Sequence, residues 1–201
     1  MNVTYKEGLT FYDGTCYTGF VHNETHAFHG YGVCVFASGD RYEGGWFQGA
    51  MQGWGVLTFA DNDVLGRVEY RGGMLANEVD GHGIMTYKEG TTYEGGWKQG
   101  KRDGYGKYIE AGQYGEYLGG WHDDAANGYG VRVRANRSRY EGGYKMQKRE
   151  GHGVQVWPDG VRYEGGWKTD NRHGNGVQIG ANGNAISGEW RDDVWVGNYQ
   201  L

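Results

Sequence analysis

The sequence predicts an all-β fold, an elongated single-layer antiparallel sheet of stacked β-hairpins. The composition, a short repeated motif and the alternation of residue types within that motif all predict it. The 201 residues include 41 glycines, 17 tyrosines, 8 tryptophans and 6 phenylalanines, but only one proline, Pro158. Glycine costs up to about 1 kcal/mol per position in a helix, which excludes an ordinary helical domain. The lack of a Gly-X-Y period excludes collagen, and the many aromatic residues argue against a disordered linker.

A five-residue motif recurs along almost the whole chain. Tyr-Glu-Gly-Gly-Trp and its close variants begin at Tyr42, Tyr70, Tyr93, Tyr117, Tyr140 and Tyr163. Eleven residues after each of these tyrosines stands a Gly-x-Gly triplet. With an earlier copy at Tyr17 and a decayed one at Ile186, the repeats start at positions 17, 42, 70, 93, 117, 140, 163 and 186. Such periodicity indicates a repeat architecture, and we predict one continuous array over residues 1–201 with a partial repeat at 1–16.

Each repeat is predicted to form one β-hairpin. In the copy at Tyr93, period-2 alternation places Tyr93, Gly95 and Trp97 on one face of a strand. A polar six-residue loop, 98–103, leads to a returning strand at 104–109, and turns rich in Gly, Asp and Ser reverse the chain between repeats. Because aromatic rings can lie over the bare glycines of neighbouring strands, each repeat is expected to be stabilised mainly by its neighbours.

The motif resembles the MORN repeat (membrane occupation and recognition nexus) over nearly the whole chain. The copies at Tyr42, Tyr93 and Tyr163 match the pattern most fully, whereas Met74 and Tyr144 stand where other copies have tryptophan. The resemblance implies a single-sheet array with aromatic ladders along a groove. It also implies roles in tethering membranes, organising cytoskeletal assemblies or holding partner proteins.

Net charge, cysteine content and the lack of targeting segments or catalytic motifs exclude several classes of function. The net charge of −5 argues against a nucleic-acid partner. Two cysteines favour a reduced compartment, and neither a secretion signal nor a transmembrane segment is evident. The three serines do not lie in a nucleophile motif, and the Gly-x-Gly triplets do not extend to a nucleotide-binding loop. We therefore predict a non-enzymatic cytoplasmic protein, associated with the cytoskeleton or with membranes.

The aromatic ladder has two interpretations. Its residues could form the core, or they could line a partly open groove that receives a segment of a partner protein. The candidate groove residues are Tyr42, Trp46, Tyr93, Trp97, Tyr117, Trp121, Tyr163 and Trp167.

Basic residues in the predicted loops are candidates for binding anionic phospholipids such as phosphoinositides. They form two clusters, Lys98, Lys101 and Arg102, and Lys145, Lys148 and Arg149. Anionic membranes attract each nearby Lys or Arg by about 1 kcal/mol. Solvated loops are the alternative, because the formal charge of the loops varies in sign along the chain.

The last repeat replaces polar positions by apolar residues. These residues are Ile186, Val194, Trp195, Val196, Tyr199 and Leu201. They could cap the last hairpin, or they could form a homodimer interface, since an open sheet edge favours pairing.

The enlarged loop of the first repeat holds three histidines, and one cysteine stands before it and one after it. Together these five residues, Cys16, His22, His26, His29 and Cys34, are a candidate zinc set. Cysteine and histidine are the ligands that Zn²⁺ prefers, although this spacing matches no established finger and both cysteines could be buried strand residues.

Together these features predict a self-associating scaffold that organises cytoskeletal or membrane-associated proteins. The alternatives are a phosphoinositide-binding membrane adapter that uses the basic loops, or a targeting module of a larger protein.

Overall fold

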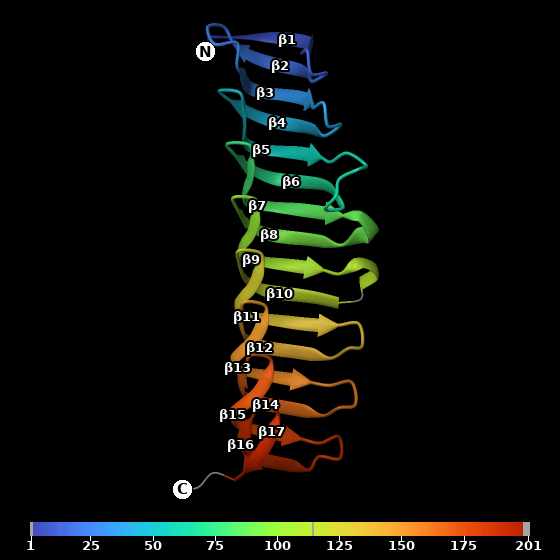
Figure 1. Cartoon of the computed structure of the whole chain (residues 1–201), viewed down its shortest axis with the longest axis vertical. Coiled ribbons are helices and arrows are strands. Elements are labelled where there is room, and N and C mark those ends of the chain that lie inside the picture. The colour runs from blue at the N-terminus through green and yellow to red at the C-terminus, as the bar shows by residue number, and fades with distance from the viewer. Residues whose placement is uncertain (1, 114, 199–201) are drawn as a thin grey trace. The chain divides into compact units, whose positions relative to one another are not determined.

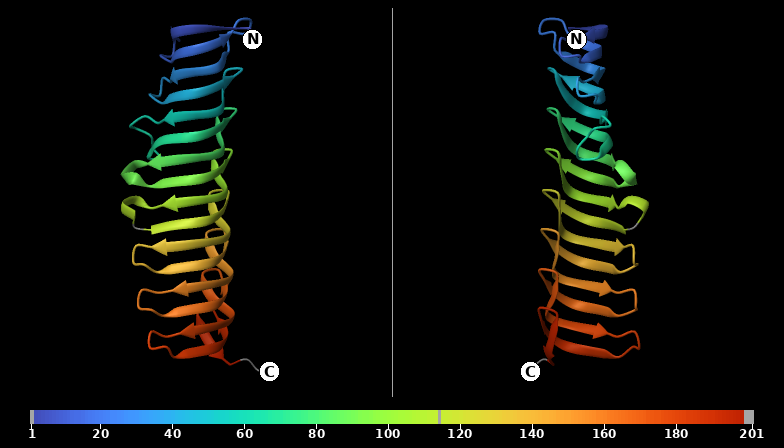
Figure 2. Two further views of the ribbon diagram at one scale, coloured as in Figure 1. Left: turned by 180° about the vertical axis from the view of Figure 1, so that it is seen from behind. Right: turned by 45° about the vertical axis from the view of Figure 1, so that its right-hand side comes forward.

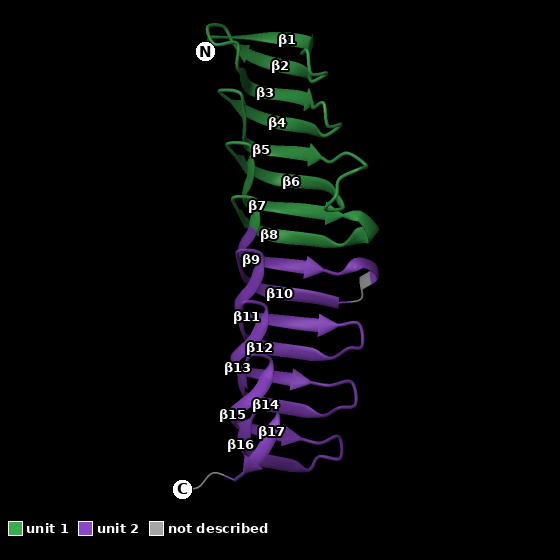
Figure 3. Ribbon diagram, in the orientation of Figure 1, with its two compact units in different colours: residues 1–101 green, residues 102–201 purple. Residues whose placement is uncertain are grey.

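The computed structural model describes residues 2–113 and 115–198, which are all-β with antiparallel strand pairing (Figure 1). The chain divides into two compact units, residues 1–101 (unit 1) and 102–201 (unit 2) (Figure 3). Within each unit, consecutive strands pair along a single-layer sheet. The single-layer hairpin architecture predicted from the sequence is confirmed.

Unit 1 contains eight strands and one short 3₁₀ turn. They are β1 (Val3–Thr10), β2 (Cys16–His22), β3 (Phe28–Val35), β4 (Arg41–Phe47), β5 (Ala50–Thr58), β6 (Arg67–Leu75), β7 (Glu78–Tyr87), η1 (Lys88–Gly90) and β8 (Thr92–Lys98). In the part of the chain that the structure describes, no helix is long and apolar enough to cross a membrane.

Unit 2 repeats the same arrangement. Its elements are β9 (Lys101–Ile109), which starts at the last residue of unit 1, η2 (Ala111–Gln113), β10 (Gly115–His122), β11 (Ala125–Arg134), β12 (Arg139–Lys145), β13 (Lys148–Val156), β14 (Arg162–Lys168), β15 (Asn171–Ile179), β16 (Ala185–Arg191) and β17 (Val194–Gly197).

The hairpin connections are shorter than the sequence predicts. A six-residue loop was expected after each tryptophan position, but β14 runs to Lys168 and β15 resumes at Asn171. Thr169 and Asp170 form the whole turn, with φ of 50° and 71°. Positive φ at both central residues is typical of a type I′ turn, whose twist matches that of the flanking strands. The Asn-Gly signal of such turns is absent here, which explains the error.

Steric constraints explain why the motif has two consecutive glycines. A Cβ on Gly165 would lie 2.5 Å from the Cα of Gly176, its partner across the sheet, and one on Gly166 would lie 2.0 Å from the carbonyl oxygen of His173. Between Gly165 and Trp167 the register is irregular, and Gly174 has a φ of 76°. In Figure 2 the strands of unit 2 curve toward the end of the hairpins that carries the two-residue turns.

The core is a ladder of aromatic rings over these glycines. We call the face that carries the repeat tyrosines and tryptophans the inner face, and the opposite one the outer face. The Tyr163 hydroxyl donates to the Gly166 carbonyl at 3.1 Å, and the Trp167 indole donates to the Gly153 carbonyl at 3.2 Å. The two rings meet edge to face, with centroids 5.3 Å apart. Each ring is therefore held by both packing and a hydrogen bond.

Candidate functional site

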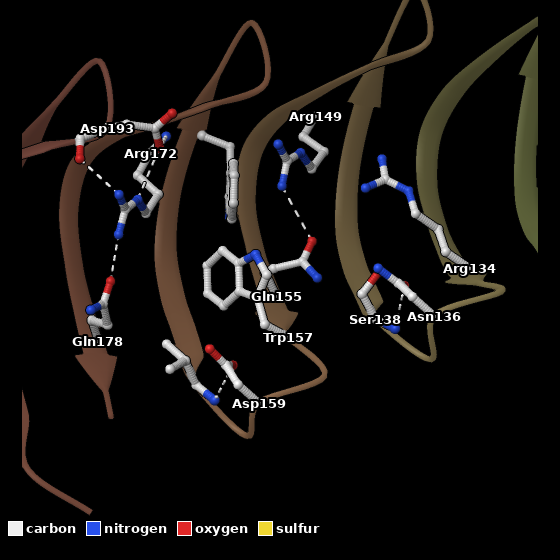
Figure 4. A pocket seen from close by; sticks show the side chains of 12 residues that line it. Arg134, Asn136, Ser138, Arg149, Gln155, Trp157, Asp159, Arg172, Gln178 and Asp193 are labelled. Carbon is white, nitrogen blue, oxygen red and sulfur yellow. Dashed lines mark hydrogen bonds and ion pairs between the residues drawn. The ribbon is translucent and has the colours of Figure 1, made fainter. Parts of the chain in front are cut away.

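Two adjoining cavities open on the inner face of unit 2. The main cavity measures about 510 Å³ and the small cavity about 150 Å³. They share four lining residues, Arg134, Ser138, Arg149 and Gln155. Figure 4 shows the main cavity with the Trp157 ring near its centre. The two cavities therefore form one candidate binding site.

The strand register explains why polar side chains point into this site. Arg132, Gln155 and Gln178 are the cross-strand partners of the repeat tyrosines, so they lie on the inner face. Arg134 and Trp157 follow two residues later, where the strands approach the turns, and period-2 alternation places them on the same face.

Three arginines in unit 2 make the same pair of contacts, which we call the Arg–Asp clamp. Each guanidinium lies over a tryptophan and bonds an aspartate in the turn of the next hairpin. The pairs are Arg102–Asp124 at 2.9 Å, Arg149–Asp170 at 3.1 Å and Arg172–Asp193 at 2.9 Å. The rings beneath are Trp121, Trp167 and Trp190, at 4.3, 4.0 and 4.2 Å from the guanidinium carbon. An ion pair of this kind contributes up to about 1 kcal/mol, and the cation–π contact a similar amount.

The contacts with Arg172 lower the pKa of Asp193. Burial alone would raise the pKa of Asp193, but hydrogen bonds from the backbone N–H and guanidinium of Arg172 outweigh it and lower the pKa below its usual range. The carboxylate therefore stays ionised, and its contribution to stability is present above pH 4 and is lost as the pH falls through the lowered value.

Glutamines fix two of the clamp arginines from the other side. Gln155 is only 4% exposed and accepts a hydrogen bond from Arg149 at 3.2 Å. Its amide nitrogen donates to the carbonyls of Arg139 and Val156, and Gln178 accepts from Arg172 in the same way. These hydrogen bonds hold the side chains of Arg149 and Arg172 in the wall of the main cavity.

The clamp is missing between two consecutive hairpins of unit 2, β10–β11 and β12–β13. Ala126 stands where its neighbours have arginine, Gln147 where they have the turn aspartate, and Tyr144 where they have tryptophan. Ala126 is buried, and Gln147 keeps the backbone contact of the turn by donating its N–H to the Ala126 carbonyl at 3.0 Å. The small cavity lies at the second of these hairpins, where Tyr144 and Gln147 line it.

Three arginines, Arg132, Arg134 and Arg149, line the small cavity together with Tyr144. Burial raises the pKa of Tyr144 to about 12, while the positive charges of Arg132, Arg149 and Arg134 act to lower it. Arg132 pairs with Glu110 at 3.1 Å. Within the described residues, Arg134 has neither an ion pair nor a side-chain hydrogen bond, and the Tyr144 hydroxyl has no hydrogen-bond partner. These polar groups face the cavity unsatisfied by the protein.

The residues predicted to line an aromatic groove are buried instead. Tyr42, Tyr93 and Tyr163 are fully buried, and Trp46, Trp97, Tyr117, Trp121 and Trp167 are buried almost as deeply. The core interpretation therefore accounts for them, and they offer little surface to a partner. The open part of the inner face lies beside them, in the cavities.

The six predicted lipid-binding residues have different roles. Arg102 and Arg149 belong to clamps, so their charges are partly neutralised. Lys98, Lys101, Lys145 and Lys148 are exposed next to the hairpin turns. In unit 2 the edge that carries Lys145 and Lys148 also carries the paired acidic turn residues Asp123–Asp124 and Asp192–Asp193, so it is mixed in charge.

The candidate zinc residues do not form a ligand set. Cys34 is buried on the inner face opposite Tyr17, and burial raises the pKa of its thiol to about 11. The rings of His22 and His29 are 5.9 Å apart. Across residues 2–113 and 115–198, no group of three or more His, Cys, Asp or Glu side chains is placed to hold a metal ion. The zinc prediction fails because the alternation of β3 turns Cys34 into the core.

The structure describes four of the six residues predicted to form a dimer interface, and they lie on β16 and β17 of unit 2. Ile186, Val194, Trp195 and Val196 are all exposed, Trp195 by 40%, and the Trp195 indole donates to the Ser187 carbonyl at 3.4 Å. Tyr199 and Leu201 lie outside the described residues.

Sequence reasoning missed the residues that form the cavities. Arg132, Arg134, Gln155 and Trp157 occupy two fixed positions of the repeat, 15 and 17 residues after its first tyrosine. An alignment of the repeats with one another would have shown these positions as the variable ones. The constant tyrosines and tryptophans of the motif form the core, so a prediction based on them finds core residues and not the cavity.

Comparison with known proteins agrees with the repeat structure. The family description "MORN repeat" matches residues 26–41, 42–64, 70–92, 93–109, 117–139, 140–162 and 163–185. No curated protein matches the chain in sequence.

Two solved structures resemble the chain distantly. One is the TCP10 domain of Danio rerio CPAP in complex with a STIL peptide, 11% identical, with a TM-score of 0.38 over 94% of this chain and 99% of that one. The other is the TCP domain of Drosophila melanogaster SAS-4 in complex with a proline-rich motif of Ana2, 11% identical, with a TM-score of 0.31 over 92% of this chain and 90% of that one. Such TM-scores are too low to transfer a binding site.

Proposed function

Because the chain belongs to the MORN-repeat family, a non-catalytic repeat type, we propose that it is a protein-binding module whose unit 2 receives a segment of a partner protein. The binding surface is the pair of cavities on the inner face. The repeat backbone supplies a rigid frame, and the variable inner-face side chains supply recognition.

The observation that carries this proposal is the composition of the main cavity. Trp157 lies half-buried there, beside Arg134, Arg149 and Arg172. Tryptophan and arginine are enriched among the residues that dominate protein–protein binding energy. Small-molecule pockets are lined mainly by apolar groups, whereas polar side chains line most of this cavity, which favours a polypeptide.

Selection of peptides against the full chain tests this proposal. A display library of random linear peptides would be enriched on the immobilised protein, and the affinities of the selected peptides would be measured by calorimetry. We expect micromolar binders that lose at least tenfold in affinity on Trp157→Ala. The matched control is Leu65→Ala, which removes an exposed apolar side chain in unit 1. Binders that tolerate Trp157→Ala but not Leu65→Ala would contradict the proposal.

A scaffold needs a second contact, and we propose self-association through the exposed residues of β16 and β17. Val194, Trp195 and Val196 form a short apolar run on β17, and exposed apolar edge strands favour pairing. Trp195→Glu is expected to convert dimers to monomers in light scattering, with the circular dichroism spectrum unchanged. A variant that remains dimeric would exclude this interface.

Membrane binding is the second candidate function, favoured by one hairpin turn. Met146 is 62% exposed and is flanked by the exposed Lys145 and Lys148, so an apolar tip stands between two positive charges. Flotation with phosphoinositide-containing liposomes tests this turn. Flotation that is lost on Lys145→Gln with Lys148→Gln supports a membrane adapter, and protein that does not float excludes it.

A further inference from the structure

We propose that the small cavity of unit 2 binds the carboxylate of an aspartate or glutamate side chain in the partner segment. This inference rests on the proposed function, and it assigns one chemical group to one subsite. The subsite lies among Arg132, Arg134, Tyr144 and Arg149, next to the main cavity.

The first argument is how the cavity arises from the repeat. Elsewhere in unit 2 a clamp arginine covers the ring of the following hairpin, as Arg149 covers Trp167. At the corresponding place the side chain is only that of Ala126, so the ring of Tyr144 lacks a guanidinium cover from this position. Gln147 replaces the clamp aspartate at the same time. Arginine and aspartate are thus lost together, and the space they would fill is polar and open.

The second argument is the donor set around that space. The Tyr144 hydroxyl and the Arg134 guanidinium make no hydrogen bond or ion pair within the described residues. Both are hydrogen-bond donors, and a guanidinium binds a carboxylate with two parallel N–H donors. Ser138, which also lines the cavity, adds a second hydroxyl, so the wall offers three donor groups of two types.

The third argument is charge balance, which selects the carboxylate over a phosphate. Arg132, Arg134 and Arg149 bring three positive charges to the small cavity, and Asp170 and Glu110, which pair with two of them, bring two negative charges. Three minus two leaves one positive charge. A single carboxylate neutralises it, whereas a phosphate group with nearly two negative charges would not be balanced.

The fourth argument is the position of the subsite beside the main cavity. Arg134 lines both cavities, and the half-buried Trp157 ring lies in the main cavity, with the side chains of Gln155 and Arg149 between it and Arg134 (Figure 4). An acidic side chain held by Arg134 would therefore place its neighbours in the sequence near Trp157. We infer that the preferred segment carries an apolar residue adjacent to the acidic one.

The probe is a synthetic Gly/Ser peptide with one glutamate between two leucines. Its twin carries glutamine in place of glutamate, and a third peptide carries phosphoserine. Each is titrated into the full chain at 100 mM NaCl, and the arginine Nε–Hε resonances are followed by NMR. We expect the glutamate peptide to shift the Arg134 resonance and to bind at least tenfold more tightly than its glutamine twin. Equal binding of the two would overturn the proposal, and tighter binding of the phosphoserine peptide would replace the carboxylate by a phosphate.

Two variants and a matched control locate the effect. Arg134→Gln is expected to weaken the glutamate peptide at least fivefold, whereas Arg137→Gln removes an exposed charge in the same turn, outside both cavities, and should change affinity less than twofold. The double change Ala126→Arg with Gln147→Asp rebuilds the clamp over Tyr144, so it should abolish binding while the protein stays folded. Equal loss with Arg137→Gln, or retained binding in the rebuilt clamp, would contradict the subsite.

The outcomes separate this inference from the proposed function. If the glutamate probe is insensitive to Arg134→Gln while library-selected peptides still depend on Trp157, the carboxylate subsite is wrong and the binding module stands. If the selected peptides do not depend on Trp157 either, the proposed binding surface is wrong as well.

Discussion

Unit 1 and unit 2 share one backbone plan but differ in the side chains on their inner faces. Opposite the repeat tyrosine, unit 1 has Cys34, Leu57 and Met85, whereas three hairpins of unit 2 have Arg132, Gln155 and Gln178. On the returning strand near the hairpin turn, unit 1 has Phe28, Met51 and Val79, and unit 2 has Arg102, Ala126, Arg149 and Arg172.

This difference changes what the inner face can do. In unit 1, Phe28 stacks on Tyr17 at a centroid distance of 3.7 Å and meets Trp46 edge to face at 5.1 Å, so apolar rings pack against one another. In unit 2, ion-paired arginines and glutamines occupy most of the corresponding positions, and the inner face there contains polar cavities. The comparison teaches that tyrosine, tryptophan and glycine determine the backbone, and the remaining inner positions are free to determine binding.

Alkaline pH should unfold both units, since both depend on neutral tyrosines. Burial raises the pKa of Tyr17, Tyr42 and Tyr144 to about 12. A raised pKa stabilises the fold fully below the unfolded value of about 10, and this contribution is lost as the pH rises through the folded value. We expect near-complete unfolding between about pH 10 and 12, followed by tyrosinate absorbance and far-ultraviolet circular dichroism. Tyrosines that ionise near pH 10 with the fold intact would contradict the tyrosine core in the unit concerned.

A valine at a paired glycine should destabilise both units alike. A Cβ on Gly55 would lie 2.4 Å from the Tyr42 hydroxyl, and one on Gly153 would lie 2.3 Å from the Tyr140 hydroxyl. Because ring and backbone are both fixed, Gly55→Val and Gly153→Val are each expected to cost about 3 kcal/mol in urea denaturation. His152→Ala, at an exposed position between two glycines, should cost less than about 0.5 kcal/mol. A large effect in one unit only would show that the units do not share one frame.

Removing a clamp charge should have a smaller effect, confined to unit 2. Asp170→Asn leaves the side chain of Arg149 without its ion partner, and we expect a loss of about 1 kcal/mol. The matched change in unit 1 is Asn77→Asp at the same turn position, which faces Met51 and should change stability by less than about 0.3 kcal/mol. Amide hydrogen exchange in β14 and β15, compared with β6 and β7, measures both. Equal effects would mean that the clamps do not distinguish the units.

The smallest expected effect concerns the glutamine that supports the clamp. Gln155→Glu places a carboxylate beside Arg149, which already pairs with Asp170, and buries a charge that must also face the carbonyls of Arg139 and Val156. The gain and the cost nearly cancel, so we expect a change within about 0.5 kcal/mol at pH 7 in thermal denaturation. A loss above about 2 kcal/mol would show that the two carbonyl contacts matter more than the contact with Arg149.

The sequence was sufficient to predict the repeat hairpins, because their cause is local. Alternation of large and bare positions, as at Tyr163 and Gly165, defines a strand face without reference to the rest of the chain. The length of the hairpin turns was not predictable, since residues such as Thr169 and Asp170 adopt positive φ under the constraint of the flanking strands. Turn chemistry alone would favour glycine there.

The candidate site was less predictable because it depends on register between hairpins. Arg149 meets Trp167 and Asp170 only because consecutive hairpins stack at a fixed offset. The buried groove residues show the converse, since alternation predicts their common face but not how deeply the neighbouring strands cover them. Continuity of the array across residues 1–201 stays a prediction.

Amide hydrogen exchange of the full chain, with and without a selected peptide, tests the central claim most directly. We predict added protection in β11, β13 and β15 and in the turn at 134–138, with the strands of unit 1 unchanged. Protection of β3, β5 and β7, with unit 2 unchanged, would contradict the claim that the variable inner face of unit 2 is the binding surface.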